Sequence, residues 1–136
     1  MRRYLLDTGM AGDFINRRQG VDSRVGDAAL RGDIVGVCVP VLAELWGGIE
    51  LSTSRDRNLD RMKHALARLR IWPFDVKAAE VYGRLYAELR RKGRTIQQVD
   101  LQIAAIALNL GNCTVVSKDS DLSAVPGLSV ENWATA

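Results

Sequence analysis

The 136-residue chain alternates between two spacings of hydrophobic residues, and each spacing predicts a different kind of element. Short apolar or β-branched runs predict strands at 4–7, 34–40 and 114–117, with shorter extended pieces at 71–74 and 128–133. The first run is apolar at consecutive positions, which is typical of a strand covered on both faces. The second is expected to end at its terminal proline.

Between these runs, apolar residues recur every three or four positions, as on one face of an amphipathic helix. The predicted helices cover residues 10–19, 23–33, 41–52, 56–71, 75–93 and 99–111. Asp75 is the expected N-cap of the longest helix, and Gly93 and Gly111 are expected to end the last two. Strands alternating with helices predict an α/β domain with a central, mainly parallel sheet and helices on both faces. The length suits one domain over residues 1–136.

Composition narrows the class of protein. The hydrophobic fraction of 47% is that of a globular protein, and no apolar run is long enough to cross a bilayer. No secretory signal is visible, so we expect a cytoplasmic location without membrane association. Cys38 and Cys113 are too few for a disulfide framework and are expected to be free thiols. His64 lies in a basic stretch without ligand-spaced partners, which favours a surface position over catalysis.

Charge is distributed unevenly along the chain. Residues 1–94 hold 18 Lys and Arg against 12 Asp and Glu, whereas residues 95–136 hold one Lys against four acids. The basic residues gather at 55–70 and 84–94. Such runs are usually the solvated faces of helices. The alternative is a surface that attracts phosphates.

Four acids fall where the carboxyl ends of the parallel strands should meet, the edge at which ligands collect in such sheets. They are Asp7, Glu44, Asp100 and Asp119. Each has a simpler explanation: Asp7 and Asp100 as helix caps, Glu44 as a first-turn partner of a helix dipole, and Asp119 or Asp121 as a turn residue.

Together, the four acids favour a metal centre. Carboxylates at one edge repel one another and raise each other's pKa, and a divalent cation removes that cost. Mg²⁺ and Mn²⁺ prefer oxygen ligands of this kind. Such a centre typically acts on phosphate esters, and the basic first part of the chain makes a nuclease the leading hypothesis.

Four segments of the chain carry a resemblance to a known family. In order, "YLLDTG", "VPVLAELWGG", "VDLQIAAIALNLG" and "TVVSKDSDLSAVPGLSVENW" resemble the motifs of PIN-domain ribonucleases, and most closely those of VapC-type toxins from bacterial toxin–antitoxin pairs. The resemblance covers almost the whole chain. It implies a PIN-like α/β/α sandwich and metal-dependent hydrolysis of RNA.

The resemblance also implies roles for individual residues. The family binds Mg²⁺ or Mn²⁺ through acids that correspond to Asp7, Glu44, Asp100 and Asp119, which are therefore the expected catalytic and metal-binding residues. The expected supporting residues are Thr8, Ser117 and Asp121. Members commonly form homodimers and are silenced by an antitoxin that lies over the active-site groove. A VapB-type antitoxin and a toxin–antitoxin hetero-oligomer are thus the expected assemblies.

Two positions depart from the family pattern, and two alternatives stay open. Gly9 stands where the family has Asn, and Val41 where it has Thr. The Gly9 departure allows a PIN-fold binding module with weakened chemistry, which RNA cleavage would distinguish from an enzyme. A receiver-type phosphoacceptor domain also has an acidic edge, but it needs adjacent acids after the first strand, where this chain has only Asp7.

RNA is the expected substrate, and the basic helices are the expected surface for its phosphates. Four arginines are predicted to bind them, namely Arg61, Arg68, Arg90 and Arg91.

Overall fold

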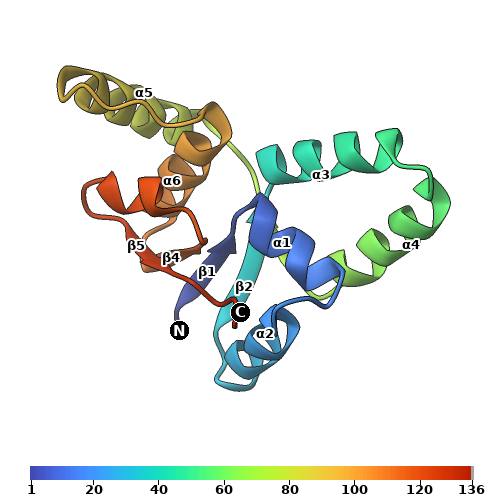
Figure 1. Ribbon diagram of the computed structural model, residues 1–136. Coiled ribbons are helices and arrows are strands. Elements are labelled where there is room, and N and C mark those ends of the chain that lie inside the picture. Colours follow the sequence, from blue (N-terminus) through green and yellow to red (C-terminus); the bar gives the residue numbers. More distant parts are fainter. Residues whose placement is uncertain (136) are drawn as a thin grey trace.

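The computed structural model describes residues 1–135 and has a five-stranded sheet at its centre (Figure 1). The sheet order is β3-β2-β1-β4-β5, and every neighbouring pair is parallel. The strands are β1 (Arg3–Leu6), β2 (Ile34–Cys38), β3 (Arg70–Trp72), β4 (Cys113–Val116) and β5 (Ser129–Glu131). The predicted α/β class is confirmed, and the sheet is parallel throughout.

Six α-helices flank the sheet in two groups (Figure 1). One group holds α1 (Thr8–Ile15), α2 (Val21–Leu30), α3 (Val39–Leu51) and α4 (Arg55–Leu66). The other is a helical hairpin of α5 (Val76–Arg91) and α6 (Gln98–Leu110), from which α5 projects as an arm. A short 3₁₀ helix, η1 (Ser120–Ala124), follows β4. No helix within residues 1–135 is long and apolar enough to cross a membrane.

The core forms where β1 runs through the middle of the sheet. Leu5 and Leu6 are fully buried, and Val115 of β4 and Ile103 of α6 are equally inaccessible. This confirms a first strand covered on both faces. Gly36 in β2 allows the neighbouring strand β3 to approach closely, because a Cβ there would collide with the Arg70 carbonyl oxygen and the Trp72 ring. Only glycine lets β3 pack at this edge.

Two predicted boundaries are wrong at the edge of the sheet. Pro40 does not end the second strand but sits in the first turn of α3, where a missing backbone N–H costs nothing. The helix predicted over 56–71 ends at Leu66, and β3 begins at Arg70. Helical spacing of apolar residues continues as far as Leu69, so the pattern alone did not reveal the break.

The first helix is also displaced from its predicted range of 10–19. It begins at Thr8 and ends at Ile15, and Arg17 and Gln19 then take positive φ values of 53° and 60°. The later caps are confirmed: the carboxylate of Asp75 accepts the Ala78 N–H at 2.9 Å. Gly93 and Gly111 follow the last two helices with positive φ.

The cysteine prediction is confirmed, since Cys38 and Cys113 are both free. Burial raises the pKa of Cys38 to about 11 and that of Cys113 to about 12. Both thiols are therefore protonated at neutral pH, Cys38 within the core and Cys113 partly buried against it.

Candidate active site

Asp7 occupies the turn between β1 and α1 and makes two sets of contacts. As N-cap of α1, its Oδ1 accepts the Met10 N–H at 2.8 Å. Its Oδ2 accepts the Ser117 hydroxyl at 2.6 Å. The side chain is buried, and its backbone N–H reaches the last carbonyl of β4, that of Val116, at 3.0 Å. The cap explanation is thus correct, yet a carboxylate has lone pairs to spare for a cation.

The pKa of Asp7 is raised, mainly by burial. The hydrogen bonds from Ser117 and Met10 oppose this rise, whereas the nearby carboxylates of Asp119 and Asp13 add to it. Burial and like charge therefore both disfavour the ionised form in the absence of a cation.

Ser117 links the ends of β1 and β4. Besides donating to Asp7, its hydroxyl accepts the backbone N–H of Asp119 at 2.8 Å. Asp119 in turn caps η1, because its Oδ1 accepts the Asp121 N–H at 2.8 Å. The turn explanation for Asp119 is therefore also correct. Asp121 contacts this acid through its backbone, and the residue is exposed.

Glu44 lies in the middle of α3, not in its first turn, so the helix-dipole explanation is wrong. Its Oε1 accepts a hydrogen bond from the Thr8 hydroxyl of α1. Val41, which replaces the family threonine, is fully buried. The hydroxyl that holds Glu44 therefore comes from α1 rather than from α3 itself.

Asp100 is the acid on which the charges of the other three acids act. It sits in the first turn of α6, whose N-cap is Gln97, so the simpler explanation of Asp100 as a helix cap is wrong. Its pKa is raised to about 6, first by partial burial and then by the nearby carboxylate of Asp119. The charges of Asp7 and Glu44 raise it further. Four acids from distant parts of the sequence thus share one electrostatic environment.

The donor set fits a hydrated Mg²⁺ or Mn²⁺ ion. Within residues 1–135, no three carboxylate, histidine or cysteine side chains stand close enough to enclose an ion as they are. Mg²⁺ usually binds through one or two carboxylates and keeps several waters, so it does not need such a cage. An ion here would also relieve the repulsion that raises the pKa of Asp100.

Two residues at this edge were missed by the sequence reasoning. Lys118, between Ser117 and Asp119, places its Nζ 3.5 Å from an Asp13 carboxylate oxygen of α1. Asp13 is close enough to Asp7 to raise its pKa. The only signal was that Lys118 is the single basic residue after position 94.

Gly9 lies in the first turn of α1 without a positive φ. A Cβ there would meet only Asp7 Oδ1, at an ordinary contact distance of 3.8 Å. The backbone conformation at this position therefore does not require glycine. An asparagine fits, and its amide would lie beside the Asp7 carboxylate.

The four predicted RNA-binding arginines do not form one surface. Arg61 and Arg68 line a cleft of about 740 Å³ between α4 and the end of α1. Arg90 and Arg91 lie in the last turn of α5, which packs against α6 rather than α4. In Figure 1 the two helices extend from opposite sides of the molecule.

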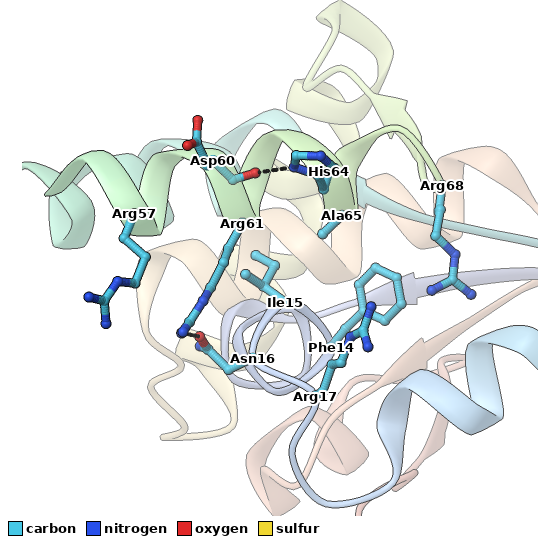
Figure 2. A pocket seen from close by; sticks show the side chains of 10 residues that line it. All are labelled: Phe14, Ile15, Asn16, Arg17, Arg57, Asp60, Arg61, His64, Ala65 and Arg68. Carbon is cyan, nitrogen blue, oxygen red and sulfur yellow. Dashed lines mark hydrogen bonds between the residues drawn. The ribbon is translucent and has the colours of Figure 1, made fainter. Parts of the chain in front are cut away.

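The cleft has a basic wall and an apolar floor (Figure 2). Arg61 Nη1 lies 3.4 Å from Asn16 Oδ1, and the Arg68 guanidinium lies 5.1 Å from the centre of the Phe14 ring. Arg17 and Arg57 line the same cleft. None of the four arginines that line it forms an ion pair with another residue of the described chain. The exposed His64 bonds only the Asp60 carbonyl, at 2.8 Å, as expected for a surface position.

The chain matches the model of a known protein family. The family model for the PIN domain matches residues 4–128, which is most of the chain. The chain belongs to the PIN-domain family. The resemblance expected from its four motifs is confirmed, and the receiver-domain alternative is wrong.

The relatives of this PIN domain include VapC proteins. Ribonuclease VapC2 of Rickettsia felis is 32% identical over 132 residues, which cover 96% of this chain and 97% of the relative. Ribonuclease VapC2 of Haemophilus influenzae is 33% identical over 134 residues, which cover 98% of this chain and 99% of the relative. A chain in the crystal structure of VapBC2 from Rickettsia felis, bound to a DNA fragment from the promoter, superposes with a TM-score of 0.89 at 31% identity, covering 96% of this PIN domain and 98% of that chain.

Proposed function

We propose that this PIN domain is a Mg²⁺- or Mn²⁺-dependent endoribonuclease and the toxin of a toxin–antitoxin pair. The observation that supports this most directly is the raised pKa of Asp100, caused in part by the charges of Asp119, Asp7 and Glu44. Four acids that interact and form no ion pair within residues 1–135 support a cation site at this edge. The relatives named ribonuclease VapC2 support RNA as the substrate.

In the proposed mechanism, Asp7 and Asp100 would hold the ion directly. The chemistry that a divalent cation would supply there is polarisation of a phosphoryl oxygen and a lower pKa for a coordinated water. Glu44, held by the Thr8 hydroxyl, and Asp119, held by the turn into η1, would orient the attacking water or hold the ion through water. Ser117 positions Asp7 through the hydroxyl hydrogen bond to its Oδ2.

Substrate binding in this proposal uses four arginines that form no ion pair within residues 1–135. Arg61 and Arg68 in the α1–α4 cleft, and Arg90 and Arg91 at the end of α5, bind RNA phosphates. The cleft begins about 12 Å along α1 from Asp7, given the rise of about 1.5 Å per residue. An RNA strand that reaches this cleft therefore extends several nucleotides beyond the acids.

Regulation would come from a VapB-type antitoxin. The solved Rickettsia felis relative is a VapBC2 complex on promoter DNA, which supports a toxin–antitoxin hetero-oligomer for this chain as well. A homodimer of the toxin is the other assembly that we propose, from the resemblance to the family.

The first prediction concerns cleavage of RNA. The purified wild-type chain is expected to cut total RNA with Mg²⁺ and to leave it intact with EDTA. Asp7→Asn keeps the size of the side chain but removes its charge, so the fold should survive. Cleavage should fall at least ~100-fold, since a ligand should matter no less than a general acid or base.

The control for this experiment is the melting temperature of the variant, which shows whether the α1 cap is kept. A folded Asp7→Asn chain that cuts RNA as well as the wild type would show that this acidic edge is not the active site. Wild-type protein that binds RNA without cutting it would instead favour the binding module suggested by Gly9.

A further inference from the structure

A small cavity of about 220 Å³ lies between the end of α5 and the segment that leads to α6. After α5 the chain reverses at Gly93, and the Arg94 N–H donates to the Leu89 carbonyl at 2.8 Å. This bond fixes the return segment alongside α5 (Figure 1). The far wall is Leu101, the neighbour of Asp100 in α6.

The walls of this cavity suit a flat aromatic group. Tyr86 forms one wall and keeps 46% of its surface exposed. Its ring is held by Tyr82, stacked at a centroid distance of 6.3 Å with 15° between planes. Leu89 and Ile96 supply further apolar surface. The volume is below the roughly 300–1,000 Å³ of pockets for drug-sized ligands, so it suits one ring system rather than a larger molecule.

The rim of the cavity is positively charged. Arg90 lies with its guanidinium 5.4 Å from the centre of the Tyr86 ring, and Arg94 lies on the return segment. No carboxylate lines the cavity, and neither arginine forms an ion pair within residues 1–135. Thr95 adds a hydroxyl that can bond the polar edge of a base.

We propose that this cavity binds one unpaired nucleobase of the RNA. Bases of single-stranded RNA stack on aromatic side chains, and nearby arginines bind the adjoining phosphates. This inference rests on the proposed ribonuclease function and adds a preference to it. Because a paired base stays inside its helix, the substrate is a loop or another single-stranded segment.

The experiment measures binding and cleavage separately. A short unstructured oligoribonucleotide containing 2-aminopurine is titrated with the full chain in EDTA, and its cleavage is followed with Mg²⁺. Tyr86→Ala should weaken binding about tenfold and remove the quenching of the probe, whereas Tyr86→Phe should keep both. Val76→Ala is the matched control, because Val76 is an exposed apolar residue of the same helix outside the cavity.

The outcomes separate the two proposals. Wild-type protein that cuts RNA, with Tyr86→Ala binding and quenching the probe equally well, would overturn the base-binding site and leave the nuclease intact. Binding that depends on Tyr86, without any Mg²⁺-dependent cleavage, would overturn the nuclease and leave the base-binding site. A change of oligomeric state on Tyr86→Ala, with RNA affinity unchanged, would assign this surface to a protein partner instead.

Discussion

Asp7 shows how one side chain serves both the fold and the proposed chemistry. The sequence presented helix capping and metal binding as alternatives, but the two uses are compatible. One oxygen caps α1 and the other accepts the Ser117 hydroxyl, and each keeps a free lone pair. The cap fixes the carboxylate at the end of β1. The cap and the hydroxyl hydrogen bond therefore orient the carboxylate for the proposed ligand role.

The second prediction concerns Gly9, at the same scale. Gly9→Asn should fold at least as well as the wild type, because asparagine is a slightly better helix former and a Cβ has room there. Its amide would lie beside the Asp7 carboxylate, so RNA cleavage should stay constant or rise by up to about tenfold, the lower range for groups that orient metal ligands. Initial cleavage rates in Mg²⁺ measure this.

Gly9→Ala is the matched control, since it adds the Cβ without the amide. A rise that occurs equally in both variants would come from helix stabilisation and not from ordering of Asp7. A loss of activity in Gly9→Asn with an unchanged melting temperature would show that glycine is required at this position for catalysis.

At the scale of elements, the helices separate residues that the sequence grouped by charge. Arg61 and Arg68 are seven residues apart in sequence and line one cleft together. Arg90 and Arg91 are carried away by α5, which belongs to the hairpin with α6. The basic composition of the first 94 residues therefore corresponds to at least two surfaces rather than one.

The third prediction follows from this separation. Replacing Arg61 and Arg68 by Gln should reduce the slope of log Kd against log salt by about 1.4, given about 0.7 per phosphate contact with a single strand. Replacing Arg90 and Arg91 should do the same independently, so the combined variant should show the sum. Fluorescence titrations with single-stranded RNA over a salt series measure the slopes.

Arg55→Gln is the control for the third prediction, because Arg55 begins α4 but is already paired with Glu50 at 3.0 Å. Its slope should equal that of the wild type. If the fourfold variant also keeps the wild-type slope, these arginines belong to solvated helix faces and do not contact phosphates.

At the scale of the whole molecule, a cation held at the proposed metal site would stabilise the folded chain. Binding to the folded state alone stabilises by about 2.7 kcal/mol at a hundredfold excess over Kd, or roughly 10 °C for a chain of this size. The fourth prediction is that Mg²⁺ or Mn²⁺ raises the melting temperature and that Asp7→Asn with Asp100→Asn abolishes this rise. Thermal melts with metal and with EDTA measure it.

The pH dependence of the metal-free protein gives a further check on this prediction. The Asp100 pKa is raised from 3.8 to about 6, so the folded state binds a proton more tightly and loses stability as pH rises through that window. In EDTA, Asp100→Asn should therefore melt higher than the wild type at neutral pH, and the difference should shrink on acidification. A double variant with a full metal response would place the ion elsewhere.

Much of the fold follows from local patterns. The apolar run before Asp7, the cap at Asp75 and the stops at Gly93 and Gly111 agree with the structure, since each depends on neighbours a few residues away. The wrong boundaries also come from reading local patterns alone. Helical spacing continued past Leu66 although a strand was needed to pair with β2, and that pairing is a long-range interaction. The single domain over 1–136 and the roles of the acids stay predictions.

The sequence by itself determined the α/β class and the family, because periodicity, caps and motif order are properties of short segments, and it proposed the four acids as the site. Only the tertiary structure decided that Asp100 interacts with Asp119, Asp7 and Glu44, and that Ser117 bridges two strand ends. Those contacts require β1 and β4 to be neighbours with their carboxyl ends together. Sheet order is set by packing across the whole chain, so no local pattern encodes it.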